Sequence, residues 1–525
     1  MPIHIIPQPN KVKSYDQSFS INHSSTICYH GRSYAGEFLC GLLGLERKES
    51  GDIKLIIDDA IRHEEGYILK ISSDGIVIRA KTDKGLFYGA QSLRQLLPAS
   101  IEQNGICNEV IVTQSEVEDE PRFGYRGFML DSARHFFPIE TILGLIDLLA
   151  LHKLNRFHWH LSDDQGFRIE LDRFPKLSEI ASKRKETQCK GFMLPWTRRF
   201  DGTPYSGIYT KEQIRQVVSY AKRRYIEVIP EIDMPGHFLA ALAAYPGFSC
   251  TGGPFDVRTG WGISKDVLCV GKPQSIQFAK DILKEVVELF PYKQVHIGGD
   301  ETPLDRWKKC PDCQRLKAEK GFRKNSELQR YFSNAIISSL KNEGCEVIAW
   351  DEILKDGNFP EITIQNWSLT GGRRIKKSIK KGQQCIISNM SKYYMDYPFH
   401  VFPLRSTYSF NPELKGLSKQ DAKNIIGVEA PLWTEAVDTA KRIYWQMFPR
   451  LTAVCESAWT FDENKNFKSF LSRLENIEKR YDALGVTYAT KASYRYDGKS
   501  RILRILFASD HVATLEYRKY SVMKE

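Results

Sequence analysis

Arg156-Phe-His-Trp-His-Leu161 is a short β-like run, and it ends on the polar residues Ser162-Asp-Asp164. The next such run, Ile226-Glu-Val-Ile229, follows residues 210–224, whose apolar positions are spaced as on one face of a helix. A strand, an amphipathic helix and a second strand in this order are typical of a parallel βαβ unit. The fold class that the sequence predicts therefore depends on the number of such units along the chain.

The unit recurs until eight β-like runs are complete. The other six runs are Gly127-Phe-Met-Leu130, Val295-His-Ile297, Glu346-Val-Ile-Ala-Trp350, Ile362-Thr-Ile-Gln-Asn-Trp367, Gln384-Cys-Ile-Ile387 and Ile426-Gly-Val428. Helical spacing also occurs over residues 139–152, 273–289, 326–340 and 440–457. Eight alternating strands predict an α/β fold of the (β/α)8 TIM-barrel type. An open doubly wound sheet is the alternative, but no glycine-rich phosphate loop follows a first strand.

A smaller α/β domain is expected before the barrel, over residues 1–120. Ile53-Lys-Leu-Ile-Ile57 and Tyr67-Ile-Leu-Lys-Ile-Ser72 are β-rich, and residues 84–97 have helical spacing that ends at Pro98. The acidic stretch 114–120 is expected to be a linker. The barrel is then expected over residues 121–485, and residues 486–525 form a basic C-terminal tail or appendage whose fold the pattern does not predict.

Composition excludes several classes of protein. The 525 residues are 42% hydrophobic and 26% charged, which is typical of a globular protein. The net charge of +11 is mild for this length and no dense basic block occurs, so nucleic acid is not an expected partner. No apolar run approaches the ~20 residues of a membrane span. The first residues lack a basic region followed by an apolar one, so the protein is cytosolic or its signal segment is absent from this chain.

The cysteines do not predict a metal site. There are 11, an odd number, and most lie inside apolar runs. Only Cys310-Pro-Asp-Cys313 is closely spaced, and no second such pair is present to complete a four-cysteine zinc site. A local disulfide or simple packing is expected there, and no metal is predicted.

Acidic and aromatic residues follow most of the eight runs, at the barrel end where active sites lie. Asp300 and Glu301 are adjacent and follow Gly298-Gly299. In a regular strand they would point to opposite faces, but a Gly-Gly break lets the chain turn both into the cleft. Paired carboxyl groups are typical of glycoside hydrolysis, and like charges at close range raise the pKa of one of them.

These blocks resemble the β-N-acetylhexosaminidases of glycoside hydrolase family 20. The resemblance is carried, in the family's order, by Arg126-Gly-Phe-Met-Leu-Asp-Ser-Ala-Arg-His135, His158-Trp-His-Leu-Ser-Asp-Asp-Gln-Gly-Phe-Arg168, Glu231-Ile-Asp-Met-Pro-Gly-His237, His296-Ile-Gly-Gly-Asp-Glu301, Trp350-Asp-Glu352 and Leu432-Trp-Thr-Glu435. Gly85-Leu-Phe-Tyr-Gly-Ala-Gln-Ser-Leu93 resembles the family's small domain. The resemblance implies an exo-acting, retaining enzyme that needs no cofactor and removes terminal β-linked GlcNAc or GalNAc from a carbohydrate substrate. It also implies a monomer or homodimer, and a periplasmic, secreted or lysosome-like location.

The resemblance also implies the roles of individual residues. Glu301 is similar to the family's general acid/base, and Asp300 to the residue that orients the substrate's 2-acetamido group, whose oxygen is the nucleophile and forms an oxazolinium intermediate. Tyr394, chosen over Tyr393 by its spacing to Asp396, resembles the tyrosine that binds this oxygen. The remaining expected substrate contacts are the indole walls Trp350, Trp367 and Trp433 and the hydroxyl-binding residues Arg134, Glu435 and Asp396. Asp163, preferred to Asp164, and His237 resemble the pair that holds and tunes Glu301, while His158 and His296 are expected to be satisfied histidines of the core or of the layer behind the site.

Two other functions are weighed against this one. His158-Trp-His160 has the i, i+2 spacing of metal ligands, which would suit a metal-dependent hydrolase on the same fold. A sugar-binding protein without turnover would use the same cleft, but it would not need both Asp300 and Glu301.

Overall fold

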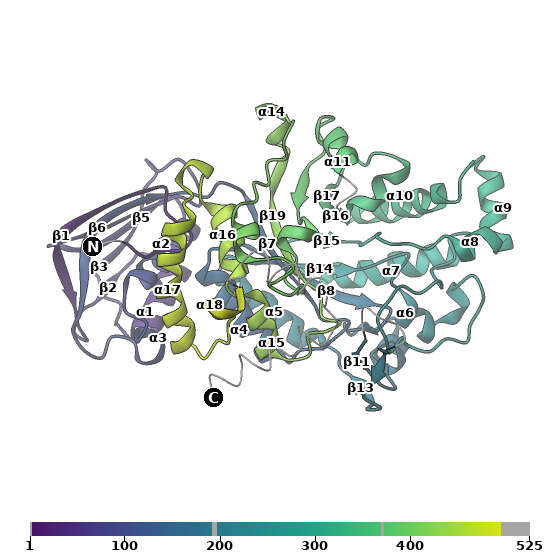
Figure 1. The fold of residues 1–525 in the computed structure, drawn as a ribbon, viewed down its shortest axis with the longest axis horizontal. Helices are drawn as coiled ribbons and strands as arrows, with labels where there is room; N and C mark the ends of the chain where they lie inside the picture. Colours follow the sequence, from purple (N-terminus) through teal and green to yellow (C-terminus); the bar gives the residue numbers. More distant parts are fainter. Residues whose placement is uncertain (1–2, 192–196, 369–371, 495–525) are drawn as a thin grey trace.

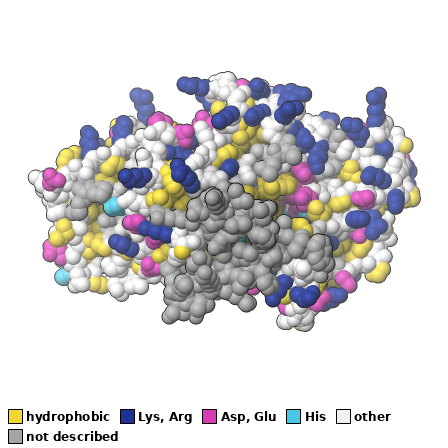
Figure 2. Space-filling view, in the orientation of Figure 1, with side chains coloured by type: hydrophobic (Ala, Val, Ile, Leu, Met, Phe, Trp, Pro, Cys, Tyr) yellow, Lys and Arg dark blue, Asp and Glu magenta, His cyan; other side chains and the backbone are white. Residues whose placement is uncertain are grey.

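Two sheets lie side by side in the computed structural model, which describes residues 3–191, 197–368 and 372–494 (Figure 1). The N-terminal sheet lies at one end of the elongated molecule, and the closed barrel occupies the rest. On the face that Figure 2 shows, Lys and Arg side chains gather at the upper edge, near α11 (Gly372–Ile379) and α14 (Lys419–Ala422). Part of the excess positive charge is therefore local to that edge.

The N-terminal sheet has six strands in the order β1-β6-β4-β5-β3-β2. The strands are β1 (Lys11–Ile21), β2 (Ile27–Cys28), β3 (Ile53–Ile57), β4 (Tyr67–Ser72), β5 (Gly75–Ala80) and β6 (Val110–Asp119). Helices α1 (Tyr34–Leu43), α2 (Asp83–Leu96) and α3 (Ile101–Asn104) accompany the sheet, and α2 packs against β4 and β5. Thr82 caps α2 by accepting a hydrogen bond from the Gly85 amide. The predicted strands 53–57 and 67–72 and the predicted helix are confirmed.

The prediction of a linker over residues 114–120 was wrong, because all but the last of these residues belong to β6, which pairs with both β1 and β4. Its last residue, Asp119, is buried, although the neighbouring Glu118 is exposed. Asp119 Oδ2 accepts hydrogen bonds from Tyr67 Oη at 2.7 Å, Trp459 Nε1 at 2.9 Å and Lys153 Nζ at 3.0 Å. The last two donors belong to the barrel, so the stretch that was expected to be a linker holds the N-terminal sheet against the barrel.

Eight parallel strands close the barrel. They are β7 (Tyr125–Asp131), β8 (Arg156–Asp163), β14 (Glu227–Ile232), β15 (Gln294–His296), β16 (Glu346–Trp350), β17 (Thr363–Asn366), β18 (Cys385–Ile387) and β19 (Ile425–Leu432). Closure is made by β19 and β7, which pair from Gly427 with Tyr125 to Leu432 with Leu130. Each predicted run overlaps one of these strands, so the predicted TIM barrel is confirmed.

Helices follow most of the barrel strands, as the alternation predicts. They include α4 (Ile139–Leu151), α5 (Lys211–Lys222), α7 (Pro273–Glu288), α10 (Ser326–Asn342) and α11. The single helix expected over 440–457 is instead two helices, α15 (Ala440–Met447) and α16 (Arg450–Trp459). The break falls at Phe448-Pro449 because proline has no amide to continue the helix and disfavours helical backbone in the residue before it. After β16 only a short 3-10 helix, η4 (Asp351–Asp356), is present.

Side chains from alternate strands fill the barrel interior in layers. An apolar layer contains Tyr125, Ile229, Ile348 and Ile386, from β7, β14, β16 and β18. The other four strands contribute the buried polar side chains His158, His296, Gln365 and Glu429. This alternation is typical of TIM barrels. The polar side chains lie behind the residues that follow the strands.

The end of the chain packs on the barrel as far as it is described. The Ala489 amide donates a hydrogen bond to the Phe448 carbonyl at 3.0 Å, and a short helix, α18 (Lys491–Tyr494), follows. Most of the tail expected over 486–525 lies outside the described residues, and the boundaries at 120 and 485 stay predictions. Among the helices that are described, none has both the length and the apolar character needed to cross a membrane.

Candidate active site

The turn after β15 brings Asp300 and Glu301 to the same side. Gly298 and Gly299 have φ of +65° and +93°, and Glu301 has a φ of +42° although it carries a side chain. A Cβ at Gly298 would lie 1.7 Å from Asp233 Oδ1, so only glycine fits there. As a result both carboxyl groups face one imidazole, with His237 Nε2 3.6 Å from Glu301 Oε2 and 4.0 Å from Asp300 Oδ2.

A chain of charged groups lies behind Glu301. His237 Nδ1 lies 3.2 Å from Asp163 Oδ1, and Arg134 Nη2 lies 2.6 Å from Asp163 Oδ2. Burial lowers the pKa of His237, but the charge of Asp163, the hydrogen bond to Asp163 and the charge of Asp300 more than offset this and raise it well above its ordinary value. The raised pKa favours the imidazolium form of His237, whose Nδ1 faces Asp163 and whose Nε2 faces Glu301 and Asp300.

The neighbouring carboxyl, Asp164, has a different environment. Its oxygens accept hydrogen bonds from the backbone amides of Leu239 at 3.1 Å and Ser264 at 2.7 Å. Asp164 thus holds the loop that follows β14, while Asp163 contacts His237. The geometry favours the choice of Asp163 that the sequence suggested.

Asp300 lies against a third acid that was not among the predicted site residues. Burial raises the pKa of Asp300 to about 7; His237 opposes this rise and Glu301 adds to it. Burial and the charge of Asp300 raise the pKa of Asp233 well above its ordinary value, because two neighbouring buried carboxylates repel each other. Asp233 Oδ1 also accepts the Gly299 amide at 2.9 Å. The available signal was its position four residues after the third β-like run, two residues beyond Glu231.

The four predicted aromatic residues form one continuous belt. Ring centroids are 6.1 Å apart for Trp350 and Trp433, 6.5 Å for Trp433 and Tyr394, and 6.3 Å for Tyr394 and Trp367. Trp350 is oriented by its Nε1, which donates to Glu231 Oε1 at 2.8 Å. Tyr393 instead packs edge-on against Phe410, so only Tyr394 joins the belt.

Arg134, Glu435 and Asp396 gather beside this belt. Arg134 lies over the Trp433 ring at 4.8 Å from its centroid, and its Nη1 is 4.0 Å from Glu435 Oε1. Burial and the charge of Glu435 raise the pKa of Asp396 to about 8. Within the described part of the chain, the buried Asp396 Oδ1 has no hydrogen-bond partner. A buried carboxyl oxygen without a partner is suited to a ligand hydroxyl.

The buried histidines of β8 and β15, behind the site, contact acidic side chains. His158 Nδ1 lies 2.9 Å from Glu429 Oε1, and its Nε2 lies 3.0 Å from Glu231 Oε2. His160 Nδ1 and Nε2 lie 2.5 Å from Glu231 and 3.2 Å from Asp163. Burial lowers the pKa of His158, but Glu429 and Glu231 outweigh this effect and raise it to about 9. Both ring nitrogens of His158 and of His160 lie next to carboxylates, so the i, i+2 spacing of these histidines serves contacts with acidic side chains in this structure. His296 Nδ1 lies 2.9 Å from Glu231 Oε1, but within the described residues its buried Nε2 has no hydrogen-bond partner, so the expectation of a fully satisfied His296 was wrong.

A TIM barrel whose carboxyl pair lies beside an indole belt at the ends of the strands defines the class of barrel glycoside hydrolases. Residues 123–462 match the family described as "Glycosyl hydrolase family 20, catalytic domain", and residues 2–120 match its "domain 2". The chain belongs to glycosyl hydrolase family 20, which confirms the resemblance seen in its sequence.

Individual relatives agree with this assignment. The chain is 39% identical to a beta-hexosaminidase of Porphyromonas gingivalis over 93% of its own length, although it spans only 64% of that relative. It is 31% identical to a beta-hexosaminidase of Akkermansia muciniphila over 83% of its length and 89% of that relative. The structure of an exo beta-N-acetylglucosaminidase from Vibrio harveyi, in complex with N-acetylglucosamine, superposes with a TM-score of 0.82 at 29% identity, covering 93% of this chain and 78% of the other. A beta-N-acetylhexosaminidase from Streptomyces coelicolor gives 0.82 at 28% identity, with 95% and 99% covered.

Proposed function

We propose that this chain is an exo-acting, retaining β-N-acetylhexosaminidase that removes terminal non-reducing β-linked GlcNAc or GalNAc from oligosaccharides or glycoconjugates. The observation that carries the proposal is the Gly298–Gly299 turn, which sets Asp300 and Glu301 beside one imidazole. The family and the sugar bound in the Vibrio harveyi structure support this substrate class.

Glu301 is the proposed general acid/base. Its side chain is 38% exposed, so it can reach a glycosidic oxygen, while His237 stays 3.6 Å behind it. In the first step the Glu301 proton passes to the glycosidic oxygen as its bond to the anomeric carbon breaks, and the acetamido oxygen bonds to that carbon. In the second step a water molecule gives a proton to Glu301 and displaces the acetamido oxygen. Two displacements at one carbon retain its configuration.

Asp300 is proposed to hold the acetamido group and to stabilise the positive charge that it gains. A nearby cation favours the ionised form of a carboxyl group, so the oxazolinium intermediate would lower the raised pKa of Asp300. Burial raises the pKa of Tyr394 well above its ordinary value, so its hydroxyl stays protonated and can donate to the acetamido oxygen. The Asp300 contact strengthens as positive charge develops on the acetamido group, which is the condition for lowering the activation barrier, whereas the Tyr394 contact orients the acetamido oxygen for its attack.

The remaining site residues are proposed to bind the sugar. The faces of Trp350, Trp367 and Trp433 would enclose the acetamido methyl group and exclude water. The second set, Arg134, Glu435 and Asp396, would bind the hydroxyls of a terminal residue. Each charge-assisted hydrogen bond to such a hydroxyl contributes ~1.5–3 kcal/mol. Because these charged groups would close the inner end of the site, a terminal rather than an internal sugar fits.

The test is hydrolysis of chromogenic N-acetyl-β-glucosaminides and galactosaminides. Glu301→Gln should abolish most turnover, by ~10²–10⁴-fold, because general acid help of that size is lost. Glu361→Gln, an exposed glutamate, is the control and should keep full activity. A thiazoline mimic of the cyclised intermediate should inhibit competitively, and indifference to it would argue against the acetamido nucleophile. Hydrolysis that survives Glu301→Gln with an intact fold would overturn the assignment of the acid.

The same assay separates the enzyme from a sugar-binding protein without turnover, since the latter would bind N-acetylhexosamines and release no chromophore. The proposal includes a carbohydrate substrate, no cofactor for the reaction and no nucleic-acid partner. It also includes a monomer or homodimer that works in a periplasmic, secreted or lysosome-like setting.

A further inference from the structure

Four of the cysteines meet at one point, on the loops that follow β14 and β15. Cys269 Sγ lies 3.6 Å from Cys310 Sγ and 3.7 Å from Cys313 Sγ, and Cys250 Sγ lies 3.8 Å from Cys313 Sγ. All four sulfur atoms lie within 4.8 Å of one another. We expected that no second pair of cysteines would complete a four-cysteine site with Cys310 and Cys313. That expectation was wrong, because Cys250 and Cys269 form the second pair from another loop.

The spacing of the sulfur atoms fits one ion. Zinc binds thiolates at ~2.3 Å in a tetrahedron, whose corners are then ~3.8 Å apart. A disulfide needs the two sulfurs at ~2.05 Å, and Cys269 lies at almost the same distance from two partners rather than close to one. We propose that Cys250, Cys269, Cys310 and Cys313 bind a structural zinc ion.

The backbone around the cluster presents the sulfurs from two segments. Cys310 precedes α9 (Pro311–Glu319) and Cys313 lies in its first turn, where the helix dipole favours thiolates. Cys269 donates its amide to the Phe248 carbonyl at 2.9 Å, which places it beside Cys250. The two segments approach closely, since a Cβ at Gly271 would lie 2.2 Å from the Asp312 carbonyl carbon.

Burial and charge also suit a bound cation. Cys269, Cys310 and Cys313 are buried, and Cys250 is half-buried. Four thiolates so placed would repel one another strongly without a metal ion, since buried charges need compensation. Lys272 Nζ donates to the Gly247 and Ser249 carbonyls at 3.0 and 2.8 Å and interacts electrostatically with Cys269, so it offsets part of the negative charge of a zinc tetrathiolate.

The cluster joins the two loops that carry the proposed acid/base residues. Asp233 and His237 lie on the loop that contains Cys250 and Cys269, and Glu301 is nine residues before Cys310. The same loops are linked beside the cluster by Trp307 Nε1, which donates to the Leu268 carbonyl at 2.9 Å. The zinc site stands without reference to the reaction, whereas its effect on turnover rests on the proposed function.

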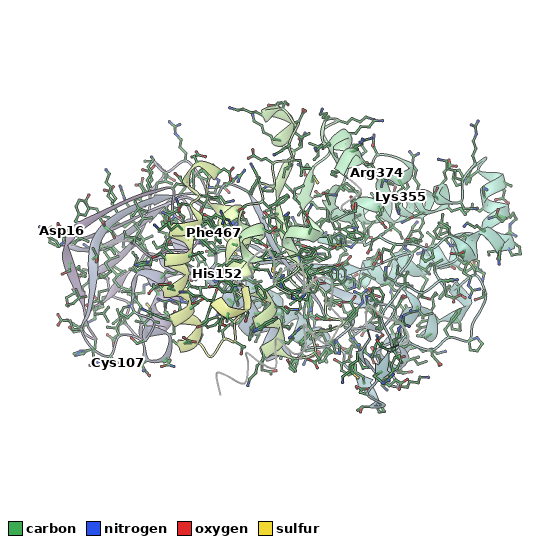
Figure 3. All side chains as sticks on the ribbon, in the orientation of Figure 1. Asp16, Cys107, His152, Lys355, Arg374 and Phe467 are labelled. Atoms are coloured by element: carbon green, nitrogen blue, oxygen red, sulfur yellow. The ribbon has the colours of Figure 1, made fainter. Side chains whose placement is uncertain are left out.

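Metal analysis of the full chain, purified without metal-affinity steps or chelators, tests the site. We expect one zinc ion per chain, and after exchange with Co²⁺ the absorption bands of a tetrahedral tetrathiolate. Cys313→Ser should lose most of this zinc. Cys107→Ser is the matched control, because Cys107 is exposed on the small domain, at the opposite end of the molecule (labelled in Figure 3) from α9 (labelled in Figure 1), and should keep the full stoichiometry. Absence of zinc together with mapped disulfides or four titratable thiols, or iron in place of zinc, would overturn the proposal.

A second measurement does not depend on how the variants fold. Removal of zinc from the unchanged protein by a strong chelator should lower its melting temperature, and Zn²⁺ but not Mg²⁺ should restore it. Turnover of the chromogenic substrate should fall mainly through kcat, since the loops rather than the sugar contacts are loosened. If zinc leaves and the melting temperature does not move, the ion is not structural. If the zinc results hold but no substrate is hydrolysed, the proposed function fails and the zinc site stands.

Discussion

Replacing Gly298 by alanine tests the turn that aims Asp300 and Glu301. The added Cβ would lie 1.7 Å from Asp233 Oδ1, and real Cβ atoms essentially never approach closer than 3.0 Å, so the carboxyl group must withdraw by about 1.3 Å. That movement breaks the 2.9 Å hydrogen bond from the Gly299 amide. It also shifts the carboxyl group whose charge interacts with that of Asp300.

Two costs add in this variant. A left-handed backbone costs a residue with a side chain ~1–2 kcal/mol, and a buried amide left without a partner costs ~1–3 kcal/mol. The free energy of unfolding should therefore fall by ~2–5 kcal/mol. Gly485→Ala separates the two costs, because Gly485 has a φ of +66°, close to the +65° of Gly298, and no heavy atom lies within 4 Å of its added Cβ. It should lose only the ~1–2 kcal/mol of the backbone term.

Urea denaturation of both variants, with steady-state kinetics on the chromogenic substrate, measures the difference. A displacement of about 1 Å near reacting groups can cost ~10²-fold in rate, so kcat/KM of Gly298→Ala should fall by that order while Gly485→Ala stays near the wild-type value. The reasoning is refuted if the two variants lose equal stability, or if Gly298→Ala keeps its turnover.

Two further predictions concern buried acids. Because the pKa of Asp300 is about 7 in the fold and 3.8 in the unfolded chain, the native state holds a proton that the unfolded chain has lost, so stability falls as the pH rises between these values. Asp300→Asn should remove this slope and melt higher than the wild type at pH 8, while kcat falls by ~10²–10³-fold; a wild-type kcat would contradict the role given to Asp300. Asp119→Ala should cost ~3–5 kcal/mol of unfolding free energy because it leaves Lys153 charged and buried. Glu118→Ala breaks the exposed Lys11–Glu118 ion pair and should cost ~0–1 kcal/mol of unfolding free energy. Equal losses of unfolding free energy in Asp119→Ala and Glu118→Ala would show that Asp119 does not hold the two domains together.

The strands and helices were predictable because their signals are local. Residues 53–57 and 67–72 became β3 and β4 with the predicted bounds, and the eight runs became the barrel strands. The local signal was misleading at residues 114–120, where an acidic composition suggested solvent. Composition does not show that Lys153 and Trp459 meet Asp119 from the other part of the molecule.

The site was predictable where residue type and position in a motif were enough. The Gly298–Gly299 break before Asp300 and Glu301 indicated a turn from the sequence, and the positive φ angles match it. Asp233 was not selected, because its role depends on being close to the Gly299 amide and Asp300, 66 and 67 residues away. Tyr394 was chosen over Tyr393 from its spacing to Asp396 alone, and the ring contacts of Tyr394 with Trp433 and of Tyr393 with Phe410 agree with that choice.

The sequence by itself thus determined the alternation of eight strands with helices, the glycine turn and the family, because each depends on residues that are neighbours in the chain or members of one short motif. Tertiary structure alone decided that Cys250 and Cys269 complete the pair at Cys310 and Cys313, and that Asp233 supports Asp300. The physical reason is that charge pairing, thiol clustering and burial depend on distances in space between distant residues, and periodicity carries no information about those distances.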